Sequence, residues 1–190
     1  MRLYTFDDHR VGVGAGDAHL VDVTALLEDG VAELDRMTDL IARWEELRPR
    51  VEQAAAEGER LALADVTLRP PQPRPRKVIA APVNYRRHQQ EMGGSDGVYR
   101  DAAIKDISTY AGFLKASSSV VGPDGAIELP FEDRRLDHEA ELGVVIGRTA
   151  SRVSRHDALD HVFGYVPLLD ITLRGEEDRS YRKSFDTFTP

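Results

Sequence analysis

The stretch DRRLDHEAELGVVIGR, residues 133–148, sets two glutamates at the entrance of an apolar run. The run AELGVVIGR (140–148) has apolar residues at successive positions, which predicts a strand buried on both faces. Side chains two residues apart in a strand point to the same face, so Glu139 and Glu141 are expected to stand side by side. Two such anions repel each other, and burying them is costly unless a cation meets them.

A third carboxylate lies in a second apolar run, FGYVPLLDIT (163–172), which also predicts a buried strand. This residue, Asp170, has apolar neighbours on both sides, and a buried aspartate is seldom without a partner. Three carboxylates supply the oxygen ligands that suit a hard cation, Mg²⁺ or Mn²⁺. The pattern leaves open the alternative that each acid pairs with a nearby arginine, such as Arg134, Arg135 or Arg174.

The composition is that of an ordinary soluble globular protein. The 190 residues are enough for one or two domains, with 41% hydrophobic and 31% charged residues. The formal net charge of −8 argues against nucleic acid as a main partner, because phosphate binding needs a cationic surface. The sequence has no cysteine, which excludes disulfides, thiolate zinc sites and cysteine nucleophiles.

Targeting features are not evident in the sequence. No run approaches the roughly 18 apolar residues that a membrane span needs. The N-terminal stretch MRLYTFDDHR is too polar for a signal peptide. We therefore expect a cytoplasmic protein that binds neither membranes nor nucleic acid.

A proline-rich segment, RPPQPRPR (69–76), predicts an extended linker between a small module (1–68) and a second part (77–190). In the module, strands are expected at 2–6 and within 10–23, the latter turning at Gly16-Asp17. Apolar residues then recur with a helical period, which predicts one helix over 31–51 that Pro49 ends or kinks.

The second part is expected to begin with a strand (77–85) followed by a helix, RRHQQEM (86–92). A polar, glycine-rich segment (93–108) is expected to form a mobile loop. The sequence GPDG (122–125) predicts a turn between short strands. Ser154 and Asp157 then resemble a capping box at the start of a helix over 155–162. This arrangement of elements indicates an α+β protein.

Other polar residues suggest chemistry less specifically. His88 and Glu91 share a face of the predicted helix, where a carboxylate could orient imidazole as a general base. A surface ion pair explains the same spacing and is favoured by spacing alone. Lys115 and Lys183 could meet a substrate carboxylate or a developing oxyanion, or could be surface residues with exposed ends. His156 and His161 do not share a helix face, so a zinc site there is not expected.

Several stretches, taken in order, are similar to the fumarylacetoacetate hydrolase family. They are RPRKVIAAPVNYRRHQQE, FLKASSSVVGP, DHEAELGVVIGR, DALDHVFGYVPLLDITLR and KSFDTFTP. The resemblance covers about residues 68–190. Its most specific part is the Glu139-x-Glu141 motif followed by Asp170. The first 67 residues resemble, more weakly, the small N-terminal module of bacterial members.

The resemblance implies a mixed β-sheet roll with a small N-terminal α/β module, usually as a homodimer with one divalent ion per site. By motif position, the metal ligands would be Glu139, Glu141 and Asp170. The catalytic residues would be His88 and Glu91, carried on a lid segment, together with Lys183. The substrate-binding residues would be Arg174, Lys115 and Tyr85.

The implied activity is metal-dependent cleavage of a carbon–carbon bond in 2,4-dioxo acids of the fumarylacetoacetate or acylpyruvate type, in aromatic catabolism. Isomerisation or decarboxylation of related dioates or oxaloacetate at the same site is an alternative, and a non-catalytic metal-binding remnant is another. The sequence departs from the family pattern at PVNY (82–85), usually GLNY, and at LDITLRG (169–175), usually NDVSARD. Family members also continue beyond the position of Pro190, so part of the roll is expected to be missing.

Overall fold

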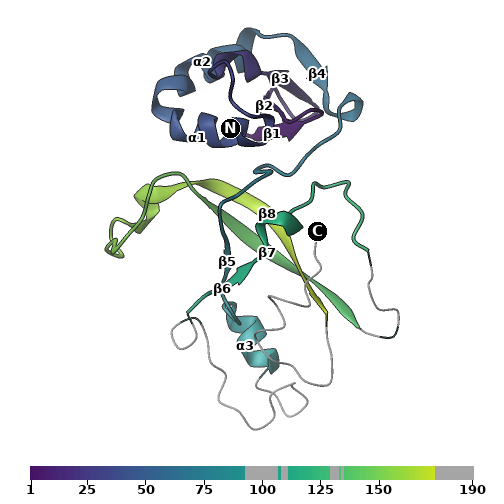
Figure 1. The fold of residues 1–190 in the computed structure, drawn as a ribbon, viewed down its shortest axis with the longest axis vertical. Coiled ribbons are helices and arrows are strands. Elements are labelled where there is room, and N and C mark those ends of the chain that lie inside the picture. Colours follow the sequence, from purple (N-terminus) through teal and green to yellow (C-terminus); the bar gives the residue numbers. More distant parts are fainter. Residues whose placement is uncertain (93–106, 108–110, 129–132, 134, 174–190) are drawn as a thin grey trace.

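The computed structural model describes residues 1–92, 107, 111–128, 133 and 135–173 (Figure 1). Four antiparallel strands, in the order β1-β2-β3-β4, form a sheet near the N-terminus. Their bounds and those of the associated helices are β1 Leu3–Phe6, β2 Arg10–Gly14, β3 His19–Asp22, β4 Arg60–Ala62, α1 Arg36–Ala42 and α2 Trp44–Glu57, with 3₁₀ turns η1 Thr24–Leu26, η2 Glu33–Asp35 and η3 Leu63–Asp65.

The turn between β2 and β3 confirms the expectation at Gly16-Asp17. Gly16 has a φ of +80°, a conformation that glycine adopts without the steric cost of a Cβ atom. The guanidinium of Arg2 donates to the Gly16 carbonyl at 2.5 Å and to the Asp17 carboxylate at 2.8 Å. These contacts hold the hairpin so that β2 and β3 present one apolar face to the helices.

Both helices pack against this face of the sheet. The shared core consists of buried apolar residues from β2, β3, their flanking residues, α1 and α2: Val11, Val13, Ala15, Val21, Val23, Met37, Leu40, Leu47 and Val51. The helical period predicted the buried positions Met37, Leu47 and Val51, but it missed the buried Leu40 and included Leu34, which is exposed.

The single helix expected over 31–51 is wrong in its boundaries. The helix is interrupted at Arg43, whose backbone (φ −104°, ψ 18°) is not helical. Pro49, which was expected to end or kink the helix, lies inside α2. A proline inside a helix removes the hydrogen bond to the carbonyl four residues earlier, and α2 tolerates that loss one turn from its start. The break divides the apolar stripe into two short ones, Met37 with Leu40 in α1 and Leu47 with Val51 in α2.

The proline-rich segment lies along this module. Leu68 bridges to Phe6, the Arg69 amide donates to the Thr5 carbonyl at 2.8 Å, and the Thr5 hydroxyl donates to the Pro71 carbonyl at 2.9 Å. Two other contacts join the segment to α1 and the residue before it. The Gln72 side chain donates to the Thr38 hydroxyl, and Arg74 forms an ion pair with Asp35. Residues 71–74 and 76 lie in bends, so the segment follows the surface of the module and is not the uniformly extended linker that its prolines predict.

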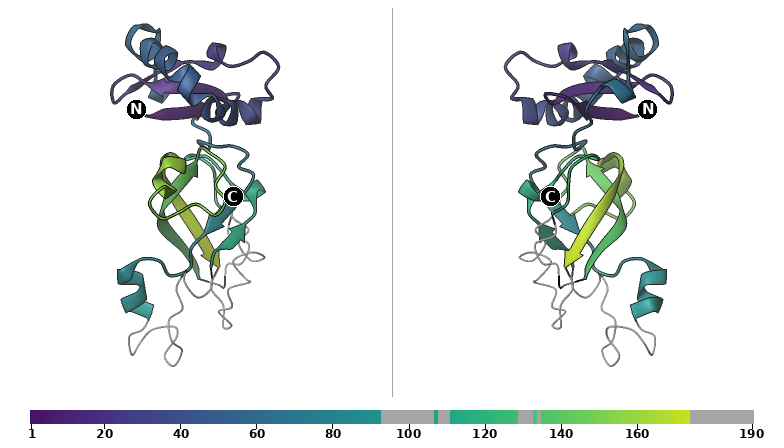
Figure 2. Two further views of the ribbon diagram at one scale, coloured as in Figure 1. Left: turned by 90° about the vertical axis from the view of Figure 1, so that its left-hand side faces the viewer. Right: turned by 90° about the vertical axis from the view of Figure 1, so that its right-hand side faces the viewer.

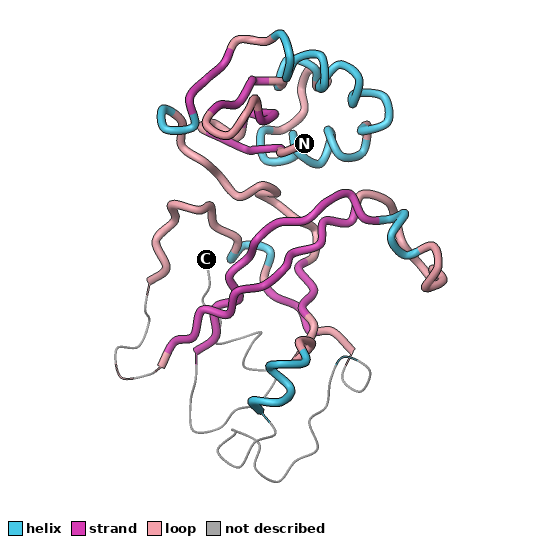
Figure 3. The backbone as a smooth tube through the Cα atoms, turned by 180° about the vertical axis from the view of Figure 1, so that it is seen from behind, coloured by secondary structure: helices cyan, strands magenta, loops and turns pink. Residues whose placement is uncertain are grey.

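The described residues after the proline-rich segment form two antiparallel ribbons, β5–β6 and β7–β8 (Figure 3). The elements are β5 Val78–Ala80, α3 Arg86–Met92, β6 Phe113–Lys115, η4 Ser117–Ser119, β7 Leu136–Ile146, η5 Ala158–His161 and β8 Val162–Leu173. The helix over 86–92 is confirmed residue for residue. The strand expected over 77–85 is shorter, since the chain leaves the ribbon after Ala80.

The connections between these strands agree only in part with expectation. The Gly125 amide donates to the Gly122 carbonyl at 3.0 Å, which confirms the GPDG turn. Ser154 and Asp157 are hydrogen bonded as a capping pair, but only the 3₁₀ turn η5 follows. Leu159, at 72% exposure, has no core to pack on, and a short helix without a packed apolar face is unstable.

The strands β7 and β8 were expected to be buried on both faces, and this expectation is wrong. Large apolar side chains on one face of the ribbon are exposed, namely Leu142, Val144, Ile146, Tyr165 and Leu169. An apolar run shows that a strand favours burial, but it does not show what covers each face. The opposite face of the ribbon carries the predicted acidic residues.

The ribbon β7–β8 meets the N-terminal module at one end (Figure 2). The rings of Trp44 and Phe163 form an edge-to-face contact with centroids 5.2 Å apart. The Arg148 guanidinium donates to the Glu45 carboxylate at 2.7 Å. The described residues thus form an α+β protein with several sheets and few helices. The expected mixed sheet is not observed in them, because every described strand pair is antiparallel.

Candidate active site

The pairing of β7 with β8 brings two predicted metal ligands opposite each other. In the antiparallel register Glu139 faces Asp170, and Glu141 faces Leu168. Side chains directly opposite each other in such a pair lie on one face, with Cβ atoms about 4.5–5.5 Å apart. Glu141 lies two residues from Glu139 and therefore shares that face. The three acids are thus placed on one side of the ribbon by backbone geometry.

The burial of these residues is graded. Asp170 is 4% exposed, whereas Glu139 and Glu141 are half-buried. Ile171 and Thr172, which follow Asp170 in β8, are buried as well. The face of the ribbon that carries the three acids is therefore the more buried of its two faces.

A lysine from the other ribbon contacts the buried aspartate. Lys115, the last residue of β6, forms an ion pair with the Asp170 carboxylate through Oδ1. The ammonium also donates to the Ile171 carbonyl at 3.3 Å. This contact joins residues 55 positions apart in the chain, and residue spacing carried no indication of it.

The donor chemistry of this face fits a divalent cation. Three carboxylates from two adjacent strands match the oxygen ligands of Mg²⁺ and Mn²⁺. As the side chains stand, however, no group of three or more acidic or histidine side chains within the described residues is gathered closely enough to hold an ion. The strand register places the three carboxylates on one face, as a cation site requires. Rotation of the side chains would have to bring their carboxylate oxygens together around an ion.

The helix α3 carries the predicted catalytic pair, His88 and Glu91, whose side chains lie outside the part that the structure describes. Its first turn is fixed by the Gln89 amide, which donates to the Tyr85 carbonyl at 2.9 Å. The Gln89 side chain donates to the Val83 carbonyl at 3.1 Å. Val83 has a φ of +44°, unusual for a β-branched residue, so the PVNY stretch enters the helix through a strained turn.

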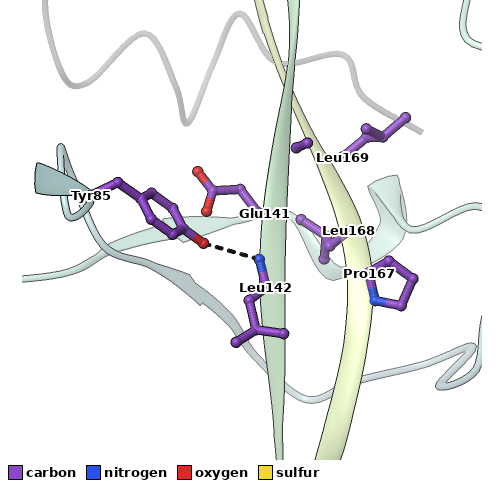
Figure 4. Close-up of a pocket in the computed structure, with 7 residues that line it drawn as sticks. Tyr85, Glu141, Leu142, Pro167, Leu168 and Leu169 are labelled. Carbon is purple, nitrogen blue, oxygen red and sulfur yellow. Dashed lines mark hydrogen bonds between the residues drawn. The ribbon is translucent and has the colours of Figure 1, made fainter. Parts of the chain in front are cut away.

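Tyr85 connects the start of α3 to the acidic strand. Its hydroxyl accepts a hydrogen bond from the Leu142 amide at 3.2 Å, next to Glu141 (Figure 4). Because that amide points away from β8, the pair of Leu142 with Pro167 needs no hydrogen bond from the proline nitrogen. This explains why β8 accommodates a proline.

A pocket of about 350 Å³ opens between Tyr85 and the ribbon. Its lining consists of Tyr85, Ala140, Glu141, Leu142, Pro167, Leu168 and Leu169. Among the described residues of this lining, Glu141 is the only carboxylate, and the surface around it is mainly apolar. Tyr85 and Glu141 were predicted as site residues, but the apolar lining was not, because the spacing of residues along a strand does not reveal a cavity.

Two of the predicted site residues lie outside the described part of the chain. These are Arg174, which directly follows β8, and Lys183. The lid expected over 86–108 is described only in its first part, α3, and at residue 107. The structure therefore brings together Glu139, Asp170 and Lys115, with Glu141 and Tyr85 beside them.

Comparison with known proteins shows the family of the chain. Residues 77–190 match the family model for the C-terminal domain of fumarylacetoacetate hydrolase. The chain belongs to the fumarylacetoacetate hydrolase family. The match begins immediately after the proline-rich segment, with the residue that precedes β5.

Named relatives extend the comparison over the whole chain. A maleylpyruvate hydrolase from Aquipseudomonas alcaligenes is 40% identical over 194 residues, which cover 100% of this chain and 67% of the relative. An oxaloacetate tautomerase from Bacillus subtilis is 36% identical over 135 residues, covering 68% of this chain and 42% of the tautomerase.

A solved structure shows the same fold. It is the maleylpyruvate hydrolase of Sphingobium sp. SYK-6 in complex with manganese(II) and pyruvate, with a TM-score of 0.77 and 38% identity. The superposition covers 99% of this chain and 64% of that protein. The chain thus spans about two thirds of these hydrolases. The family to which it belongs is a family of enzymes.

Proposed function

We propose that the protein is a divalent-metal-dependent hydrolase that cleaves a carbon–carbon bond in a 2,4-dioxo acid of the acylpyruvate type. The observation that carries this proposal is the register that sets Glu139 opposite Asp170, with Glu141 on the same face. The 40% identity to a maleylpyruvate hydrolase supports the substrate class. A relative crystallised with manganese(II) and pyruvate supports the pairing of a divalent ion with an oxoacid.

In this proposal Glu139, Glu141 and Asp170 hold one Mg²⁺ or Mn²⁺ ion. When bound, the ion would orient the 2-oxo acid and polarise its carbonyl group. Tyr85 would line the substrate pocket at the edge of β7, since its ring already bounds that cavity. Arg174, placed directly after β8, would meet the substrate carboxylate.

The protein's own groups would handle the protons and the developing charge. His88, oriented by Glu91, would accept a proton from water as the water adds to the distal carbonyl. The bond between that carbon and the methylene carbon then breaks, giving a carboxylic acid and a pyruvate enolate. Lys183 would stabilise the enolate charge until the methylene carbon takes a proton. One water is consumed, and one acid and one pyruvate are released.

A tautomerase or decarboxylase activity at the same site is the second candidate. It is favoured by the 36% identity to an oxaloacetate tautomerase. Both reactions pass through an enolate of a 2-oxo acid, and neither needs water as a nucleophile. In this account the lid segment (86–108) decides the outcome by admitting or excluding water.

We also propose the division into a module (1–68), a linker (69–76) and a catalytic domain (77–190). The buried core of residues 11–51 lies entirely within the first of these, which supports the boundary. Assembly as a homodimer is a further part of the proposal. It is supported by the exposed apolar face of β7–β8, because such faces mark interaction surfaces.

A substrate panel tests the function directly. The protein is incubated with an acylpyruvate, with oxaloacetate and with a hydroxymuconate-type dioate, each with Mn²⁺, with Mg²⁺ and with a chelator. We expect metal-dependent release of pyruvate from the acylpyruvate. Turnover of oxaloacetate alone would favour the second candidate, and no turnover of any substrate would favour a non-catalytic remnant.

The variant Glu139→Gln supplies the matching test of the residues. Removing one ligand charge should abolish metal-dependent turnover, a loss of more than about 100-fold, while the circular dichroism spectrum stays unchanged. Glu59→Gln is the control, because Glu59 is an exposed glutamate in the N-terminal module. Full activity of Glu139→Gln without added metal would refute the proposed site.

A further inference from the structure

We propose that Lys115 is an internal counter-ion that sets the charge of the metal site, and not a substrate-binding residue. The inference rests on the proposed function, since it concerns Asp170 as a metal ligand. In the absence of metal the lysine would neutralise the buried carboxylate. With metal bound, its positive charge would lower the affinity of the site for the ion.

The first line of support is burial. The side chains of Lys115 and Asp170 are 7% and 6% exposed. Lysine and aspartate are almost never buried to this extent unless they are paired. The pair therefore compensates two charges that would each be costly to bury alone.

The second line of support is geometry. The ammonium binds Asp170 through Oδ1 and donates to the carbonyl of Ile171, the next residue in β8. Lys115 is thus fixed against the strand by two contacts and cannot act as a long, exposed side chain. A residue with so little exposure and two committed contacts is poorly placed to reach a substrate in the open pocket.

The third line of support is electrostatic. Glu139 lies directly opposite Asp170, so an ion held by these two acids would lie a few ångströms from the ammonium. Like charges at such distances repel strongly in a partly buried site. The same lysine that stabilises the protein without metal should therefore weaken the binding of the metal.

A double-mutant cycle measures the first half of the inference on the metal-free full chain. Lys115→Met keeps the aliphatic length and removes the charge, and Asp170→Asn removes the opposite charge. Each single variant should lower the unfolding temperature by roughly 10 °C, because each removes one charge of a buried ion pair. The double variant should lose much less than the sum of the two. Lys77→Met is the control, because Lys77 is exposed.

Titration with Mn²⁺ by calorimetry measures the second half. Lys115→Met should bind Mn²⁺ about tenfold more tightly than the unaltered protein, and Lys77→Met should bind with unchanged affinity. A residue that merely packs would not tighten metal binding when removed. If Lys115 bound the substrate, its replacement in Lys115→Met would raise KM and leave the affinity for Mn²⁺ unchanged.

The outcomes separate this inference from the proposed function. Additive losses in the cycle, or equal or weaker Mn²⁺ binding by Lys115→Met, would overturn the role of Lys115 while leaving the metal site intact. Failure of the unaltered protein to bind Mn²⁺ would overturn the proposed function and, with it, the inference.

Discussion

At the scale of single residues, the proposed chemistry depends on how Asp170 is partnered. Its apolar neighbours predicted that Asp170 needs a cation, either a metal ion or an arginine. The structure provides one such cation, Lys115, from a strand far away in the chain. The type of partner was predictable from the cost of burying a carboxylate. Its identity was not, because the contact arises from the packing of one ribbon on another.

Also at this scale, the role of His88 is tested by separating catalysis from metal binding. His88→Ala should lower kcat for hydrolysis by about 10²–10⁴-fold, the usual contribution of a general base. The dissociation constant for Mn²⁺ should stay within about twofold, because the histidine is not among the proposed ligands. Steady-state kinetics and calorimetry give the two values.

The exposed His156, which pairs with Asp157, provides the control variant His156→Ala. It should leave both values unchanged. An equal loss of metal binding and turnover in His88→Ala would argue against the general-base role.

At the scale of elements, local sequence patterns predicted that a helix, strand or turn exists better than they predicted what packs against it. The helix over 86–92 and the hairpin at Gly16-Asp17 were predicted correctly, since their signals lie within a few residues. The exposed face of β7–β8 was not, because the alternation of a strand does not show which elements cover it. The break at Arg43 was missed because the apolar period continues across it.

The strand β3 carries a carboxylate that links the stability of the module to pH. Asp22 accepts hydrogen bonds from the Thr24 amide at 2.9 Å and the Thr24 hydroxyl at 2.6 Å, and from Arg10 Nε at 2.8 Å. Burial alone would raise the pKa of Asp22, but the bonds from Thr24 and then Arg10 outweigh it. The pKa is therefore held below its ordinary value.

A lowered pKa in the folded state fixes the sign of the pH effect. The stabilising contribution of Asp22 is complete above its unfolded pKa of about 3.9, and is lost as the pH falls through the lower folded value. Asp22→Asn should thus lower the free energy of unfolding at pH 7, and the difference should shrink below about pH 4. Urea unfolding at pH 7 and pH 3 measures it.

The exposed Asp29 supplies the control for this measurement. Asp29→Asn should change stability little at either pH. A deficit in Asp22→Asn that stays the same at both values would show that the carboxylate charge is not what stabilises β3.

At the scale of the whole molecule, the N-terminal module and the acidic ribbon form connected parts of one chain. The contacts of Trp44 with Phe163 and of Arg148 with Glu45 join α2 to the end of the ribbon away from the acids. Every helix in the described part of the chain is too short or too polar to span a bilayer. These contacts join residues about 100 to 120 positions apart in the chain, and no local pattern in the sequence indicated them.

The arrangement of the site belongs to this scale as well, because it needs both ribbons and α3. Spacing along the chain showed that Glu139 and Glu141 share a face. Only the register of β7 with β8 places Asp170 beside them. The pocket beside Tyr85 depends on where α3 begins relative to β7, which no local pattern encodes.

The most direct test of the central claim is a Mn²⁺ titration followed by electron paramagnetic resonance, in which the signal of free Mn²⁺ disappears on binding. We expect one ion per chain in the unaltered protein and in the control Glu59→Gln. Binding should be lost in Glu141→Gln, and added pyruvate should change the spectrum of the bound ion. A chain that binds no Mn²⁺, or a Glu141→Gln variant that binds it as tightly as the unaltered protein, would contradict the account.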